Sequence, residues 1–250
     1  MIGQQQKDQA EKWFKDLRDK ICEEFEILEE DHLKLAPKSD VAAKKFERKS
    51  TIRETDDKED GGGGVMATLK DGRIFEKVGV NVSAVYGNLA PEAQKSITAR
   101  KAIPELKDDP RFWASGISLV AHMRNPHTPA IHLNTRMFWT PHAWWFGGGT
   151  DLNPSIENDD DTNFFHQTLK KKCDKHNQSY YKKFKEWADE YFFIPHRKVA
   201  RGVGGIFFDD LCTGDWEKDF SFTRDVGEAF LEAYIPIVKK NYLKDWTPQD

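Results

Sequence analysis

The first thirty residues place apolar side chains among charged neighbours with the period of a helix. Trp13, Leu17, Ile21, Phe25 and Leu28 recur at three- and four-residue intervals. This spacing predicts an amphipathic packing helix over residues 1–30. Residues 33–64 are rich in charged side chains and end in four glycines, which predicts a mobile surface segment.

From residue 65 the apolar period changes to two. Val78, Val80 and Val82 alternate with other residues, so we expect a β-meander over residues 65–85. Residues 87–110 contain three prolines and are expected to form a polar connection. A β-rich block is expected from residue 112 to residue 146.

Helical spacing returns after this block, at residues 165–173, 181–191 and 222–233. Pro236 is expected to kink or end the last helix. Residues 205–208 are short and apolar, which is typical of a buried central strand. Strands adjacent in sequence, with helices before and after them, predict one α+β domain over residues 1–250, a large antiparallel β-sheet flanked by α-helices.

Composition narrows the class of protein. The chain has 250 residues, of which 38% are hydrophobic and 12% aromatic, so it can bury a substantial core. No apolar run approaches the roughly 20 residues of a membrane span. The N-terminus has no signal or transit pattern, and the three cysteines are far apart, so we expect a cytoplasmic protein with reduced thiols. The net charge of -4 argues against nucleic acid as a partner.

The segment 131–138 is the most informative for chemistry. Its period of two places His132, Asn134 and Arg136 on one face of a strand. Together they offer a proton donor or acceptor, an amide and a fixed cation suited to carboxylates. The alternative is an exposed sheet face whose polar side chains meet only water.

Three glycines follow a bulky apolar strand at residues 147–149, and Asp151 comes shortly after them. The glycines predict a tight turn with Asp151 at its tip. An ordinary hairpin is one interpretation. The other is a carboxylate presented to a ligand that is cationic or rich in N–H donors. A phosphate loop is disfavoured because no Gly-Lys-Ser/Thr follows.

Other groups leave alternatives open. His122, His132, His166 and His196 could ligate a metal, but none has the helical spacing of a zincin. The basic cluster at residues 196–202, which includes Arg201, is either a solvated patch or a site for a polyanion. No serine or cysteine motif supports acyl transfer, and no dinucleotide fingerprint is present.

Six strings taken together resemble, in order and spacing, the oxygen-dependent coproporphyrinogen-III oxidases. They are FEKVGVNVS (75–83), GISLVAH (116–122), NPHTP (125–129), HLNTR (132–136), WWFGGGTDL (144–152) and RGVGGIFFDD (201–210). The likeness spans about residues 10–240.

The resemblance implies a homodimer that converts coproporphyrinogen III to protoporphyrinogen IX in haem biosynthesis. Dioxygen is the co-substrate, no organic cofactor is needed, and two propionates become vinyl groups. It implies proton transfer by His132, substrate contacts by Ser118, Asn134, Thr135 and Arg136, and a contact of Asp151 with the pyrrole N–H groups. For bacterial members it also implies a divalent metal held by His122, His132, His166 and His196.

The physical chemistry agrees with this interpretation. Four propionates provide carboxylates for Arg136 and for the cluster near Arg201. The four pyrrole N–H donors converge on a centre that Asp151 could reach, and an electron-rich ring formed by loss of a pyrrole proton would react with dioxygen.

The sequence departs from the family pattern in two places. Asp60 precedes the four glycines where the family commonly has Glu. Family members are also expected to continue beyond Asp250 with a Gly-rich, Arg-containing segment that contacts substrate and the second subunit. If that segment is missing, the alternative is a non-catalytic tetrapyrrole-binding or carrier protein. A histidine-metal hydrolase is a third hypothesis.

Overall fold

A computed structural model describes residues 2–36, 40–55 and 58–247. The described residues form five α-helices, one 3₁₀ helix and nine strands. In chain order these are α1 (Gln4–Leu35), β1 (Glu47–Glu54), β2 (Asp60–Lys70), β3 (Phe75–Asn88), α2 (Pro91–Lys101), η1 (Pro104–Lys107), β4 (Arg111–Met123), β5 (Ala130–Trp139), β6 (Trp144–Asn153), α3 (Asp159–His176), α4 (Tyr180–Tyr191), β7 (Phe193–Ile194), β8 (Val199–Ala200), β9 (Gly205–Leu211) and α5 (Trp216–Asn241).

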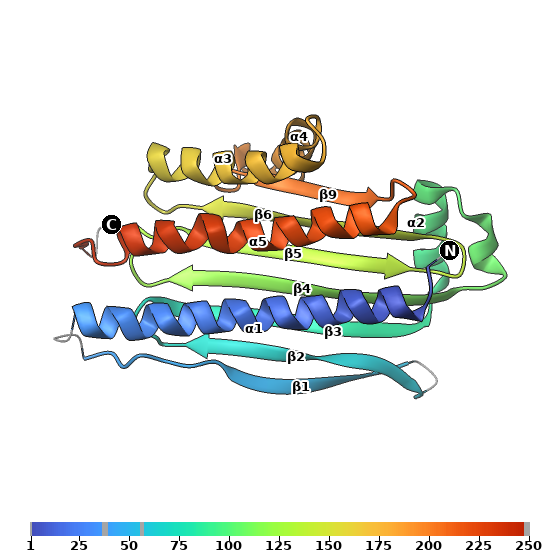
Figure 1. Ribbon diagram of the computed structural model, residues 1–250, viewed down its shortest axis with the longest axis horizontal. Helices are drawn as coiled ribbons and strands as arrows, with labels where there is room; N and C mark the ends of the chain where they lie inside the picture. The colour runs from blue at the N-terminus through green and yellow to red at the C-terminus, as the bar shows by residue number, and fades with distance from the viewer. Residues whose placement is uncertain (1, 37–39, 56–57, 248–250) are drawn as a thin grey trace.

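Seven strands form one sheet in the order β1-β2-β3-β4-β5-β6-β9, and every neighbouring pair is antiparallel. The first six strands follow each other along the chain, and β9 joins after the α3–α4 excursion (Figure 1). The predicted α+β class with a large antiparallel sheet is therefore confirmed. Within the described residues, no helix is both long enough and apolar enough to cross a membrane.

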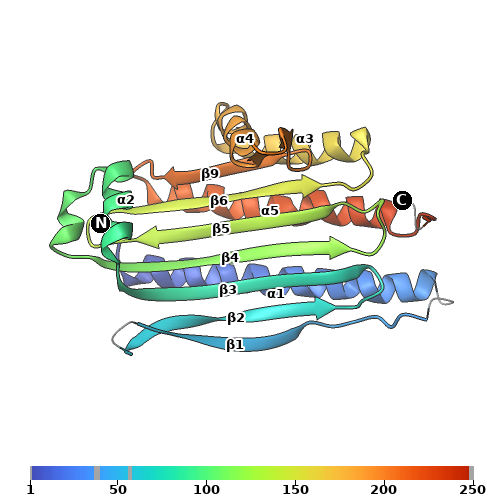
Figure 2. The ribbon, with the colours of Figure 1, turned by 180° about the vertical axis from the view of Figure 1, so that it is seen from behind.

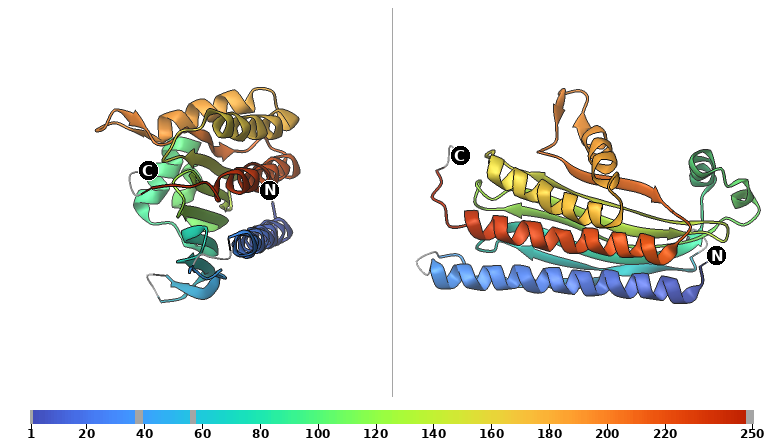
Figure 3. Two further views of the ribbon diagram at one scale, coloured as in Figure 1. Left: turned by 90° about the vertical axis from the view of Figure 1, so that its left-hand side faces the viewer. Right: turned by 45° about the horizontal axis from the view of Figure 1, so that its top comes forward.

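The long helices α1 and α5 lie side by side across one face of the sheet (Figures 1 and 3). Their apolar stripes pack on the strands: the ring of Phe25 stacks on Phe75 at 4.4 Å, and Phe220 stacks on Phe146 at 5.8 Å. The opposite face carries few helices, as Figure 2 shows, with α2 over one end of it. We call this second face the open face.

The amphipathic N-terminal helix is confirmed and runs to Leu35. The predicted surface segment at residues 33–64 is partly wrong, because it contains all of β1 and the beginning of β2; residues 37–39 and 56–57 lie outside the described residues. The polar connection predicted for residues 87–110 is also partly wrong, since it contains α2 and η1. Both segments lack an apolar stripe, so tertiary contacts decide their structure.

Two predictions near the C-terminus need correction. The strand β9 is buried, but within the described part of the chain it is an edge strand that pairs only with β6. The helix α4 covers it through contacts such as that between Phe184 and Phe208. The helix α5 does not end at Pro236 but continues to Asn241. The last turn is held by the buried side chains of Ile237 and Asn241, which offsets the missing backbone hydrogen bond.

Candidate functional site

The open face gathers the polar residues of β5. His132, Asn134 and Arg136 are each half-buried and alternate with fully buried core residues. Ser118 on β4 lies directly opposite Asn134 in the antiparallel register, so it shares this face. The predicted common face of the three β5 residues is therefore confirmed.

Thr135 lies on the other side of the sheet. Its side chain is fully buried, and Thr135 is paired with Ile117 of β4 on the face covered by the helices. A substrate contact by this side chain, which the resemblance implies, does not fit its position. The reason is the two-residue period of a strand, which turns neighbours in sequence to opposite faces.

The glycine run belongs to a strand and not to a turn. Gly147, Gly148 and Gly149 all lie inside β6 and pair with β5. A Cβ atom on Gly147 would lie 2.7 Å from Oδ1 of Asp209, and one on Gly149 would lie 2.4 Å from the carbonyl oxygen of Ile206. The predicted tight turn is wrong, because these glycines serve close approach between strands.

Asp151 lies on β6 directly opposite His132 and is completely buried. Its Oδ1 is 3.1 Å from Nδ1 of His132, and its Oδ2 accepts a hydrogen bond of 2.8 Å from Asn153. Arg201 donates to the same Oδ2 through Nε at 3.2 Å and through an Nη at 2.8 Å. Asp151 is thus the shared acceptor of an imidazole, an amide and a guanidinium.

These partners keep Asp151 ionised. Burial of the carboxyl group would by itself raise its pKa, but hydrogen bonds from His132 and Asn153 and the charge of Arg201 outweigh this effect, so the pKa of Asp151 is lowered from its usual value. An ionised carboxylate only accepts hydrogen bonds. Nδ1 of His132 therefore carries the proton of their shared hydrogen bond, and Nε2 is the ring nitrogen that Asp151 does not engage.

The segment after the β7–β8 hairpin brings Arg201 to this position. Gly202 and Gly204 have φ angles of +62° and +77°, which favour glycine. A Cβ atom on Gly202 would lie 2.3 Å from the carbonyl oxygen of Leu152. The glycines thus let the segment lie against β6, while the Arg201 guanidinium also stacks over Phe192 at 4.2 Å. The prediction that the basic cluster contributes to the site fits this geometry through Arg201.

Arg136 stands at the other end of the polar face. It donates to Oδ1 of Asn134 at 2.7 Å, and its second Nη lies 3.1 Å from Oδ1 of Asp209 on β9. Asp209 and Asn153 were not among the predicted site residues. The available signal for Asp209 was a pair of aspartates that ends an apolar strand.

The described residues do not fit the implied four-histidine metal site. No group of three or more His, Cys, Asp or Glu side chains among them is arranged to hold a metal. His122 is exposed on β4 and His196 in the β7–β8 turn. Both ring nitrogens of His166 are engaged, Nε2 with the carbonyl oxygen of Val203 at 2.9 Å and Nδ1 with the Tyr181 hydroxyl at 3.0 Å.

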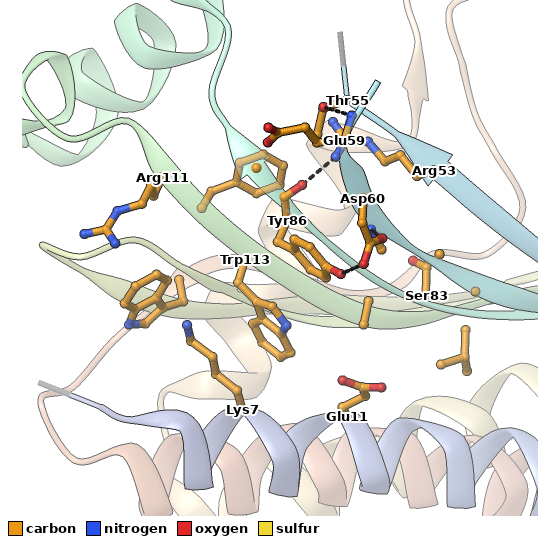
Figure 4. Close-up of a pocket in the computed structure, with 18 of the residues that line it drawn as sticks. Lys7, Glu11, Arg53, Thr55, Glu59, Asp60, Ser83, Tyr86, Arg111 and Trp113 are labelled. Carbon is orange, nitrogen blue, oxygen red and sulfur yellow. Dashed lines mark hydrogen bonds between the residues drawn. The ribbon is translucent and has the colours of Figure 1, made fainter. Parts of the chain in front are cut away.

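A cavity of about 960 Å³ lies on the helix-covered side, between the N-terminal half of α1 and strands β1–β4 (Figure 4). None of the predicted site residues lines it. Lys7 reaches from α1 to the ring of Trp139, 3.2 Å from its centroid. Of the other cations at this cavity, Lys15 pairs with Glu11, Arg18 with Asp19 and Arg111 with Asp109, while Arg53 donates hydrogen bonds to backbone carbonyl oxygens.

Comparisons with known proteins identify the family. The family model described as Coproporphyrinogen III oxidase matches residues 9–250. The chain is 46% identical over 243 residues to the oxygen-dependent coproporphyrinogen-III oxidase of Rickettsia peacockii (strain Rustic), with 97% of this chain and 81% of the relative covered. It is 44% identical over 248 residues to the enzyme of the same name from Rickettsia bellii (strain RML369-C), with 99% and 83% covered. The chain therefore belongs to the coproporphyrinogen III oxidase family.

Proposed function

We propose that this chain is an oxygen-dependent coproporphyrinogen-III oxidase, which converts two propionates of coproporphyrinogen III to vinyl groups and forms protoporphyrinogen IX for haem biosynthesis. Its family membership supports the reaction. The observation that carries the assignment of the site is the His132–Asp151 pair, which stands on the same open face as Arg136.

The reaction balances with dioxygen alone. For each propionate, one hydrogen leaves the carbon next to the ring, the bond to the carboxylate breaks, and carbon dioxide departs. Each ionised propionate releases two electrons and one proton as the vinyl group forms, and these, together with a second proton from solvent, reduce one dioxygen to hydrogen peroxide. The protein must therefore bind a polyanion, accept a proton and keep the reacting carbon close to the base.

His132 is the base in this proposal. Its Nδ1–H is held by Asp151, so Nε2 is free to take the proton from the propionate carbon. Asp151 has no exposed surface, and both of its carboxylate oxygens are engaged, Oδ1 by His132 and Oδ2 by Asn153 and Arg201. We therefore assign Asp151 to orienting His132 and holding Arg201, in place of the direct pyrrole contact that the resemblance implied.

Arg136 and Arg201 provide the cations for the propionates. His132 and Arg136 are four residues apart on one strand, which separates them by about 13 Å. That span suits a macrocycle that lies along the open face, with one carboxylate at Arg136 and another near Arg201. Asn134 and Ser118 lie between the two ends and offer hydrogen bonds to the substrate.

The homodimer remains a prediction from the resemblance, and the cytoplasmic location remains a prediction from the N-terminal sequence. For the first, the expected outcome is that the purified chain sediments at the mass of two copies. Sedimentation at the mass of one copy would contradict it.

Turnover tests the proposed function. The purified chain is incubated with coproporphyrinogen III in air, and the products are separated by chromatography. We expect a divinyl product, release of carbon dioxide and consumption of dioxygen, and no product under argon. Binding of coproporphyrinogen without dioxygen consumption would support a carrier and contradict the proposal.

A further inference from the structure

The end of the open face near α2 contains an ion-pair network of Arg136, Asp209 and Arg100. Of these three residues, the proposed function uses only Arg136. Asp209 on β9 lies between two guanidinium groups. Its Oδ1 is 3.1 Å from an Nη of Arg136, and its Oδ2 accepts a hydrogen bond of 2.9 Å from an Nη of Arg100 on α2. One carboxylate thus fixes the positions of two cations from different elements.

An irregularity in β9 creates this arrangement. Phe208 pairs with Gly148 and Leu211 pairs with Phe146, so Asp209 and Asp210 together stand opposite Gly147. This is a β-bulge, and Asp210 adopts a φ of +73°, which is uncommon for a residue with a side chain. In a regular strand the two aspartates would turn to opposite faces.

The bulge instead turns both carboxylates toward α2. Oδ1 of Asp210 lies 3.1 Å from Nζ of Lys101 and 3.6 Å from one Nη of Arg100, while Asp209 contacts the other Nη of Arg100. Strained backbone of this kind is often found where a side chain has to be aimed at a functional site. The absence of a side chain at Gly147 completes the site, because a Cβ atom there would overlap Asp209 and press on the Arg136 guanidinium.

Both guanidinium groups keep accessible donors. The Arg100 side chain is 47% exposed and that of Arg136 is 35% exposed, whereas Asp209 between them is only 12% exposed. Arg100 and Arg136 carry two positive charges against the one of Asp209 between them, while Lys101 and Asp210 pair with each other. The two guanidinium groups thus have one positive charge in excess, and their free N–H groups can receive a carboxylate from the ligand.

We propose that Arg100 is a second binding residue for the substrate carboxylate that Arg136 receives, and that Asp209 positions the two guanidinium groups for it. This inference rests on the proposed function, since it takes coproporphyrinogen III as the ligand. If Arg100 binds substrate, then α2 is part of the substrate site. In the alternative, purely structural role, the Arg100–Asp209 ion pair only stabilises the packing of α2 against β9.

Binding of coproporphyrin III, the oxidised and fluorescent form of the substrate, separates these two roles. It is titrated into the full chain and into Arg100→Gln, Arg100→Lys, Asp209→Asn and, as a matched control, Lys101→Gln. Lys101 is the neighbour of Arg100 on α2 but pairs with Asp210 and lies over Trp145 at 4.9 Å. Thermal unfolding of each variant is measured alongside.

We expect Arg100→Gln to raise the Kd about tenfold, the effect of losing one charge-assisted hydrogen bond. Arg100→Lys should recover part of this loss, and Lys101→Gln should stay within twofold of the wild type. A rise of less than threefold for Arg100→Gln would overturn the inference. So would an equal rise for Lys101→Gln.

Asp209→Asn tests the positioning role because two effects have opposite signs. Removing a negative charge should strengthen binding of an anion, whereas loss of the fixed geometry should weaken it. We expect binding at least threefold weaker; tighter binding would contradict the positioning role.

Turnover of the wild type, measured separately, tells the two proposals apart. If the wild type binds but does not turn over, the proposed function fails and the Kd series still decides this inference. If the wild type does not bind, both fail together.

Discussion

Replacing Gly147 by alanine should disable the carboxylate site with little effect on the fold. A Cβ atom at this position would lie 2.7 Å from Oδ1 of Asp209 and 3.1 Å from Cζ and Nε of Arg136. Ordinary van der Waals contact begins at 3.4 Å, so Asp209 has to move by about 0.7 Å. Both neighbours are the ends of side chains, so they can yield without displacing the strands.

The expected magnitude follows from these distances. Alanine in a strand gains about 0.5–1 kcal/mol over glycine in backbone entropy, which offsets part of the roughly 1–3 kcal/mol that overpacking costs. The melting temperature should therefore change by only a few degrees. A displacement near 1 Å at a binding group can reduce the rate by about a hundredfold, so we expect kcat/KM to fall at least tenfold, mainly through KM.

Two other glycines provide matched controls. Gly79 lies on β3, and the Asn81 side chain is 3.8 Å from its virtual Cβ, so Gly79→Ala should leave the kinetics unchanged and raise stability by about 0.5–1 kcal/mol. Gly149→Ala would place a Cβ 2.4 Å from the backbone oxygen of Ile206 and should destabilise the sheet itself. The assay is steady-state oxidation of coproporphyrinogen III with parallel thermal unfolding. Kinetics of Gly147→Ala equal to those of Gly79→Ala would refute the reasoning.

Three further predictions concern stability and pH. Glu29 is fully buried and accepts backbone hydrogen bonds from Arg73, Ile74 and Phe75 at 2.6–3.0 Å; Glu29→Ala should lower the free energy of unfolding by about 3 kcal/mol or more in urea titration, and a loss below about 1 kcal/mol would contradict this. Burial lowers the pKa of His166 from 6.5, so the unfolded chain binds a proton at this ring more readily than the folded chain does. The free energy of unfolding should therefore fall as pH drops below about 6.5. His166→Gln should show a weaker pH dependence of unfolding below about pH 6.5, and a pH dependence identical to that of the wild type would contradict this role of His166. The pKa of Asp151 is lowered from 3.8, so the ionised carboxylate stabilises the fold above pH 3.8, and this stabilisation is lost as pH falls through the lower pKa of the folded state. For Asp151→Asn, the free energy of unfolding should therefore fall less steeply with decreasing pH in the acid range. An unchanged slope would show that the ion pair with Arg201 does not contribute to stability.

The sequence predicts those features that depend on local periodicity. The period of two at residues 131–138 places His132, Asn134 and Arg136 on one face, because a strand alternates its side chains whatever lies beside it. The long helices α1 and α5 are likewise predictable from their apolar stripes.

Features that depend on which strands pair, and in which register, could not be predicted from the local periodicity of the sequence. The glycines at residues 147–149 suit a turn equally well until the register places Asp209, Thr135 and Ile206 against them. The helix α2 buries only Ile97 and therefore has no stripe to recognise. The strand β1 is exposed almost throughout, so its apolar pattern carries no signal.

The central claim is that His132, oriented by Asp151, takes the proton from the propionate. It is tested most directly by comparing kcat and KM of the wild type with those of His132→Gln, using coproporphyrinogen III in air. We predict a fall in kcat of at least about a hundredfold, as expected for the loss of a general base, with KM within threefold of the wild type. A kcat for His132→Gln equal to that of the wild type would contradict the account.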